Sequence, residues 1–292
     1  GFSAGTIFYS DIGTQCHCYQ KVKLWDEKNG VKDTVSSWAS RFYLHKHSLT
    51  DDLGPLFIEE RPLNEALIVA TAAALSGNGI NISDDLMNMQ PEYLEILSKI
   101  LPVYDEIAEP LDRYESSYPQ VWNLKIQRDF ENWDLLALFN WDDDIKDLSF
   151  SFNQIGLNQS KSYIIHDFWD EEYVGHFTQE INIFDLPPHS VKLLCVREVQ
   201  EVPQIISTNV HYTQGGVEVI SSGWDEQTQT LLAVCKKFNR YQGTIFVYVP
   251  DEYIPASTAC YGANYSFEWR KPIHSIKLNP FNEIIHFSIT FG

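Results

Sequence analysis

Basic residues are scarce in this chain of 292 residues. It has 21 lysines and arginines against 40 aspartates and glutamates, which gives a formal net charge of −19 at pH 7. A chain with this balance repels the phosphate backbone of DNA and RNA. The composition therefore argues against nucleic acid as a partner.

Long apolar runs are missing as well. No stretch of the sequence approaches the roughly 20 consecutive apolar residues that a membrane-spanning helix needs, and no signal peptide is recognisable. The sequence has no internal repeat and no low-complexity segment. We expect no membrane partner and a cytoplasmic location.

Cysteine gives no recognisable pattern. The five cysteines are an odd number at scattered positions, and a reduced compartment is the default for such a chain. Cys16-His17-Cys18 resembles part of a ligand cluster, but no second pair follows at zinc spacing. A phosphate loop, a Ser-His-Asp set and a helix-borne His-Glu pair are also lacking. We predict no metal and no cofactor.

Apolar and aromatic residues, in contrast, are plentiful. Hydrophobic residues make up 44% of the chain and aromatic residues 14%, a composition typical of a globular protein with two or three cores. Trp25, Trp38 and Trp169 could stack on sugar rings, but packing in a core or between domains is the usual role of such residues.

Residues 1–105 alternate short apolar runs with helical patterns. The β-branched and aromatic run at 6–9 predicts a strand, which places Asp11 at its carboxyl end. The other expected elements are a helix at 32–44, strands at 56–58 and 80–82, and an apolar helix at 65–75 capped by Asn64. This alternation predicts parallel α/β structure.

The segment after residue 82 has the pattern of a helix start. Ser83, Asp84 and Asp85 offer an N-cap and two acids that favour the positive end of a helix dipole. Pro91 suits the first turn of the next helix. We interpret Asp84 and Asp85 as helix caps.

Residues 106–200 and 201–292 lack helical periodicity. Ser149-Phe150-Ser151-Phe152 alternates strictly, as in a strand with one buried face. The expected strands lie at 135–141, 147–152, 162–168, 191–196, 216–221, 230–236, 244–249 and 284–289. We predict two antiparallel β-domains that join near Pro203.

Several short motifs occur in an order that is more specific than any one of them. They are Tyr9-Ser10-Asp11-Ile12, Asp51-Asp52-Leu53, Ser83-Asp84-Asp85-Leu86, Ala137-Leu138-Phe139-Asn140-Trp141, Asp167-Phe168-Trp169 and Leu186-Pro187-Pro188-His189. In this order they resemble the clan D glycoside hydrolases, the family of α-galactosidases or melibiases. That family has a (β/α)8 barrel followed by an antiparallel β-domain.

The chain departs from the family in two respects. Ile7 stands where the family often has an arginine four residues before the acid/base aspartate. The upstream strands that carry the nucleophilic aspartate in a Lys-x-Asp setting have no counterpart here. Residues 199–292 resemble only a longer subgroup with an added β-module.

The resemblance implies roles for three aspartates. Asp11 would be the general acid/base, although a strand-terminal aspartate is more commonly a turn or cap residue. Asp51 and Asp52 would contact sugar hydroxyls; their alternative is a loop and N-cap role, which is common for aspartate before a turn.

The sequence therefore predicts an α/β plus all-β chain. Residues 1–105 would form the end of a (β/α)8 catalytic barrel, 106–200 an antiparallel β-domain, and 201–292 an additional C-terminal β-sandwich module. The function implied is the C-terminal portion of a retaining α-galactosidase-like glycoside hydrolase, inactive by itself. The alternative is a non-catalytic carbohydrate-binding or structural β-protein.

The expected partner is an α-galactoside-like carbohydrate. The open edge of a partial barrel would in addition recruit a second copy of the chain, as a homo-oligomer, or a missing N-terminal catalytic segment.

Overall fold

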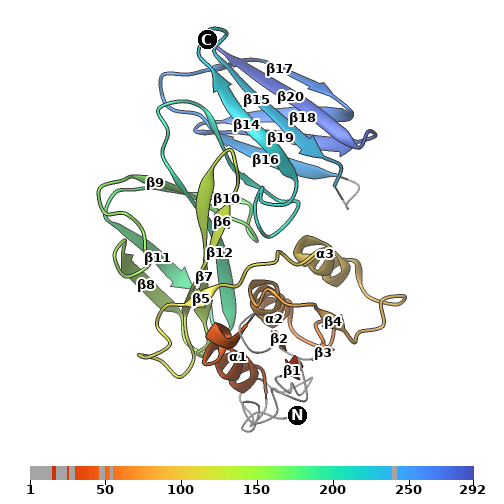
Figure 1. Cartoon of the computed structure of the whole chain (residues 1–292), viewed down its shortest axis with the longest axis vertical. Coiled ribbons are helices and arrows are strands. Elements are labelled where there is room, and N and C mark those ends of the chain that lie inside the picture. Colours follow the sequence, from red (N-terminus) through yellow and green to blue (C-terminus); the bar gives the residue numbers. More distant parts are fainter. Residues whose placement is uncertain (1–14, 18–24, 26–29, 46–49, 53–54, 239–241) are drawn as a thin grey trace. The chain divides into compact units, whose positions relative to one another are not determined.

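A computed structural model describes residues 15–17, 25, 30–45, 50–52, 55–238 and 242–292 (Figure 1). Over these residues the chain is mostly antiparallel β-sheet with few helices. No (β/α)8 barrel is present in the described part, so that element of the predicted fold class is not found there. The physical reason is the small number of parallel strands, because barrel closure takes eight of them and the parallel pairs in the N-terminal part of the described residues are two short ones.

The chain divides into two compact units. The first consists of residues 1–125, 136–157 and 180–193, and the second of 126–135, 158–179 and 194–292. The division into domains at residues 105 and 200 stays a prediction.

The N-terminal part of the first unit holds the parallel strands and the helices. Strand β1 (Gln15–His17) pairs with β2 (Thr50–Asp52), and β3 (Pro55–Leu56) pairs with β4 (Asn81–Ile82). The helices are α1 (Val31–Ala39), the short 3-10 helix η2 (Phe42–Leu44), α2 (Leu63–Leu75) and α3 (Pro91–Ile100). None of the helices in the described part is long and apolar enough to cross a bilayer.

Helix α2 is buried on nearly every side. Nine of its 13 residues are buried, including the run from Ile68 to Leu75. A helix that is apolar all round needs cover on all faces, and the packing confirms the expectation drawn from its alanine-rich sequence. Its N-cap is Pro62 rather than Asn64.

The end of α2 depends on Gly77. This residue has φ = 68°, and a Cβ added there would lie 2.6 Å from Ile107 Cγ2 and 2.7 Å from the carbonyl oxygen of Glu106. A left-handed backbone is costly for residues with a Cβ. Glycine is therefore required here by both conformation and space.

We expect Gly77→Ala to lower the free energy of unfolding by ~2 kcal/mol or more, since backbone strain and the close contact add. Gly79→Ala is the matched control, because a Cβ there meets no atom within 4 Å and its φ is not left-handed. Urea denaturation measures both variants. Equal midpoints for the two would contradict the prediction.

The central β-strands form two sheets. The six-stranded sheet runs, in order, β10 (Glu172–Phe177), β9 (Tyr163–Asp167), β12 (Ser190–Glu198), β7 (Asn132–Asn140), β6 (Val121–Gln127) and β5 (Glu109–Pro110). The two-stranded sheet pairs β8 (Lys146–Ser151) with β11 (Glu180–Leu186). The strands expected at 135–141, 147–152, 162–168 and 191–196 correspond to β7, β8, β9 and β12.

The C-terminal residues of the second unit form a β-sandwich, drawn in blue in Figure 1. One sheet runs, in order, β13 (Gln204–Thr208), β16 (Gly243–Tyr248), β19 (Ile273–Pro280) and β18 (Ala263–Arg270). The other runs β14 (Val219–Asp225), β15 (Thr230–Lys236), β20 (Ile284–Phe291) and β17 (Pro255–Tyr261). Apolar residues from both sheets, such as Ile245 and Ile285, share one core.

Candidate functional site

The three predicted site aspartates fall at the N-terminal end of the chain. Asp11 lies outside the described residues, so its acid/base role stays a prediction. Asp51 and Asp52 end strand β2, where Asp51 is opposite Cys16 and Asp52 opposite His17 of the parallel strand β1. They are strand residues rather than helix caps. The carboxyl end of a parallel strand is where α/β folds place functional residues.

The Cys16-His17-Cys18 cluster is only partly described. Cys16 and His17 form the end of β1, and Cys18 lies outside the described residues. Within the described ranges, no group of three or more histidine, cysteine, aspartate or glutamate residues is arranged to hold a metal ion.

Asp84 binds backbone rather than capping a helix. Its carboxylate accepts hydrogen bonds from the main-chain nitrogens of Ile58 (2.9 Å) and Glu59 (3.4 Å). Asp85 accepts hydrogen bonds within its own turn, and the next helix begins only at Pro91. The interpretation of both as helix caps is wrong. Short acidic side chains satisfy free N–H groups of turns as well as those of helix ends.

A buried cation, Arg61, lies between β3 and α2. Only 4% of this residue is exposed, and its Nε donates to the carbonyl oxygen of Phe57 at 2.9 Å. Burial lowers the pKa of its guanidinium, against the opposing effect of Glu65, Asp84 and Glu60. Sequence reasoning missed Arg61, because a Glu-Glu-Arg-Pro run resembles an exposed turn.

His189 connects three segments of the first unit. Its ring stacks on Trp25 at 4.3 Å between centroids, with Nδ1 3.3 Å from Oε1 of Glu65 and Nε2 2.8 Å from Oδ1 of Asp143. The side chain of Asn64 donates to the main-chain oxygen of His189 at 2.8 Å. The Pro-Pro-His motif thus holds helix α2 and the turn after β7, in agreement with a structural role for this histidine.

A buried arginine, Arg197, forms an ion pair in the second unit. Nη1 of Arg197 donates to Glu131 at 2.5 Å, while its Nε and Nη2 donate to the carbonyl oxygens of Ile206 and Gln214, each at 3.0 Å. The guanidinium also lies 3.7 Å from the centroid of the Trp133 ring. Sequence reasoning missed this cluster. The available signal was a lone arginine in the apolar strand Ser190–Glu198.

Glu218 is a second buried acid of this unit. It is 2% exposed, and the hydroxyl of Thr208 donates to its Oε1. Its Oε2 has no hydrogen-bond partner among the described residues. Burial raises the pKa of this carboxyl, against the lowering effect of Thr208 and nearby backbone N–H groups. Folding therefore raises the pH at which this carboxyl ionises.

We expect Glu218→Gln to make stability less dependent on pH. Because the pKa of Glu218 is raised on folding, the folded state retains its proton longer, and stability is lost as pH rises above ~4.3, the value of an unfolded glutamate. Glutamine keeps the neutral shape and removes this loss. The melting temperature of the variant should fall less than that of the wild type between about pH 4.5 and about pH 7.5. Parallel curves would contradict this, and exposed Glu226→Gln is the control.

The described residues define the class of protein as a β-sandwich chain with a small parallel α/β part. Residues 118–196 match the family described as the alpha galactosidase C-terminal beta sandwich domain. The resemblance to the C-terminal part of a melibiase-like protein is thereby confirmed. No curated protein is significantly similar in sequence to the chain.

Solved structures share this fold at low sequence identity. α-Galactosidase I from Mortierella vinacea is 15% identical with a TM-score of 0.51, over 66% of this chain and 55% of that one. A β-L-arabinopyranosidase from Geobacillus stearothermophilus, solved with arabinose, is 13% identical with a TM-score of 0.54, over 67% and 48%. An α-galactosidase from Saccharomyces cerevisiae is 11% identical with a TM-score of 0.52, over 65% and 62%.

The match therefore spans between about half and three fifths of the length of these enzymes. At these identities the similarity shows a common fold.

Proposed function

We propose that the chain is the C-terminal portion of a retaining α-galactosidase-like glycoside hydrolase. The observation that carries the proposal is the match of residues 118–196 to the α-galactosidase C-terminal domain. It is supported by two parallel strand pairs and three α-helices that precede this domain, where the resemblance to the α-galactosidase family implies a barrel. In this proposal residues 1–105 form the end of that barrel.

The proposed chemistry assigns one role to each candidate carboxylate. Retaining hydrolysis needs two carboxyl groups about 5–5.5 Å apart, one to attack the anomeric carbon and one to protonate the leaving oxygen. Asp11 is the proton donor, and it later activates the water that releases the sugar. Asp51 and Asp52 bind sugar hydroxyls at the carboxyl end of β2. The nucleophile comes from a Lys-x-Asp strand outside this chain.

The test compares the chain with the protein translated from the whole reading frame that contains it. The chain alone should release no 4-nitrophenol from an aryl α-galactoside, because one carboxylate cannot complete the double displacement. The longer protein should be active, and Asp11→Asn should lower its activity by about 10²–10⁴-fold. Azide should restore turnover to that variant, since it attacks the glycosyl-enzyme without a general base.

Asp129→Asn, in the exposed turn after β6, is the control and should leave activity unchanged. A reading frame without an upstream Lys-x-Asp strand would contradict the proposal, as would turnover by the chain alone that depends on Asp11. Sugar binding without turnover in the longer protein would instead support the non-catalytic carbohydrate-binding alternative.

Two expectations from the sequence belong to the same proposal. Limited proteolysis should cut near residues 105 and 200 if those are domain boundaries, because exposed linkers are cleaved first.

Fractionation of the source cells tests the cytoplasmic location.

A further inference from the structure

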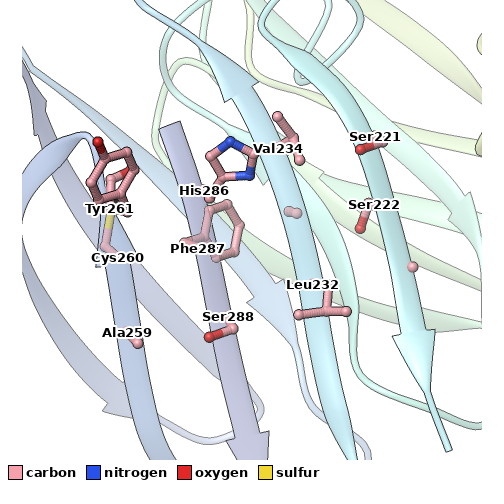
Figure 2. Close-up of a pocket in the computed structure, with 12 residues that line it drawn as sticks. Ser221, Ser222, Leu232, Val234, Ala259, Cys260, Tyr261, His286, Phe287 and Ser288 are labelled. Carbon is pink, nitrogen blue, oxygen red and sulfur yellow. Dashed lines mark hydrogen bonds between the residues drawn. The ribbon is translucent and has the colours of Figure 1, made fainter. Parts of the chain in front are cut away.

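The outer face of one sheet in the C-terminal sandwich is hollowed. The hollow has a volume of about 690 Å³ and lies over strands β14, β15, β20 and β17 (Figure 2). This volume falls within the range of about 300–1,000 Å³ that is typical of small-molecule sites. All of its lining residues belong to the second compact unit.

The strand register explains the shape of the hollow. One cross-strand row consists of Ser221, Val234, His286 and Tyr261. The neighbouring row consists of Gly223, Leu232, Ser288 and Ala259. Residues of both rows point away from the core because side chains alternate along a strand. The second row has three small residues and forms the depression. The larger side chains of the first row border this depression.

Glycine at position 223 keeps the depression open. A Cβ built there meets no atom within 4 Å, and the backbone at Gly223 is not left-handed. Neither conformation nor packing within the described structure therefore calls for glycine at this strand position. An occupant that comes close to the backbone would call for it.

The lining combines an aromatic ring, apolar surface and unused polar groups. Tyr261 is 69% exposed, and Leu232 is 49% exposed. Among the described residues, the side chains of Ser221, His286 and Ser288 and the Tyr261 hydroxyl make no hydrogen bond. No lysine, arginine, aspartate or glutamate lines the hollow.

The chemistry of the lining residues indicates which class of ligand the hollow binds. The absence of charged lining residues disfavours phosphates and other ionic ligands, which bind to paired charges. A purely apolar ligand would leave the four polar groups without partners and would remove them from water at a cost. A pyranose has an apolar face for an aromatic ring and hydroxyls for serine, tyrosine and imidazole groups.

We propose that the hollow bordered by Tyr261 and His286 on the β14–β15–β20–β17 sheet binds a neutral saccharide. The hollow is formed by other residues than the aspartates at the N-terminal end and goes beyond the proposed hydrolase, because binding here needs no catalytic group. It would hold a glycan whether or not the chain takes part in hydrolysis.

The test is native electrophoresis of the full chain through gels that contain a neutral polysaccharide. Galactomannan, xylan, starch and mixed-linkage β-glucan are the four probes. We expect retardation by at least one of them. Tyr261→Ala should raise the dissociation constant about tenfold or more, the scale of one lost aromatic contact. Gly223→Leu should abolish retardation by filling the depression.

Two controls match these changes elsewhere in the chain. Phe184→Ala removes an aromatic side chain that is 68% exposed, close to the exposure of Tyr261. Gly79→Leu adds the same side chain at another glycine with open space around it. Both should migrate like the wild type, and circular dichroism should show that all four variants are folded.

Retardation by none of the four polysaccharides would overturn the inference, as would retardation that Tyr261→Ala and Gly223→Leu leave unchanged. A fall in molar mass by light scattering in Tyr261→Ala, without a change in retardation, would identify the face as a contact between copies and would also overturn it.

The variant Asp11→Asn distinguishes saccharide binding in the hollow from the proposed hydrolase activity. That variant should retain full retardation. Loss of retardation in Asp11→Asn alone would place binding at the N-terminal aspartates and refute the hollow, while leaving the hydrolase proposal intact. Retardation that depends on Tyr261, together with a lack of glycosidase activity in the protein translated from the whole reading frame, would refute the hydrolase and support the hollow.

Discussion

Arg197→Ala is expected to lower the free energy of unfolding by about 3–5 kcal/mol. The side chain is 1% exposed and makes hydrogen bonds to Glu131 and to two main-chain oxygens. Its removal leaves the Glu131 carboxylate, whose side chain is 15% exposed, without its cation, and it also removes the contact with the Trp133 ring. Urea denaturation followed by circular dichroism measures the loss.

Arg270→Ala is the control for this variant. Its ion pair with Glu268 is at the surface, with side chains 81% and 59% exposed, and such pairs contribute at most about 1 kcal/mol. The double variant Arg197→Met with Glu131→Leu should recover part of the loss, because apolar replacement of a whole buried pair is often neutral. Similar midpoints for Arg197→Ala and Arg270→Ala would show that the buried pair does not stabilise the fold.

Trp38→Ala is expected to cost a similar amount, about 3–5 kcal/mol, through loss of apolar contact and the cavity left behind. Trp38 is fully buried on α1 and stacks on Trp122 of β6 at 4.9 Å between ring centroids. Trp122 in turn contacts Phe139 of β7 at 5.3 Å. This aromatic row fixes α1 to the central strands within the first unit.

The measurement is again urea denaturation, with Trp38→Phe as an intermediate case that keeps part of the aromatic contact. Tyr43→Ala is the control, because Tyr43 is 56% exposed and exposed substitutions change stability by about 0.5 kcal/mol or less. A loss below about 1 kcal/mol in Trp38→Ala would mean that the site collapses around the cavity.

Strand prediction succeeded where several apolar residues follow one another in the sequence. The strand predicted at 230–236 has the observed bounds of β15, Thr230–Lys236, and its sequence is a continuous apolar run from Leu231 to Cys235. β18 (Ala263–Arg270) was missed. Its sequence does carry the signal, because Tyr265, Phe267 and Trp269 alternate with polar residues in a strand that is mostly exposed at the edge of a sheet.

The local roles of single polar residues were harder to predict. The sequence predicts helix caps at Asp84 and Asp85, yet Asp84 binds the N–H groups after β3, which lie about 25 positions earlier in the chain. An aspartate that caps a helix and an aspartate that binds a turn give the same sequence pattern. Only the position of the neighbouring backbone N–H groups distinguishes the two roles.

The sequence by itself determined the acidic, globular character of the chain, the apolar burial of α2, the antiparallel strands with alternating faces and the resemblance to α-galactosidases. Each of these depends on residues close in sequence or on the order of motifs. Only the tertiary structure revealed the Arg197–Glu131 pair, the contacts of His189 and the hollow beside Tyr261. Each of these joins residues from separate strands or turns, and cross-strand register and distant packing leave no periodic signal in a single sequence.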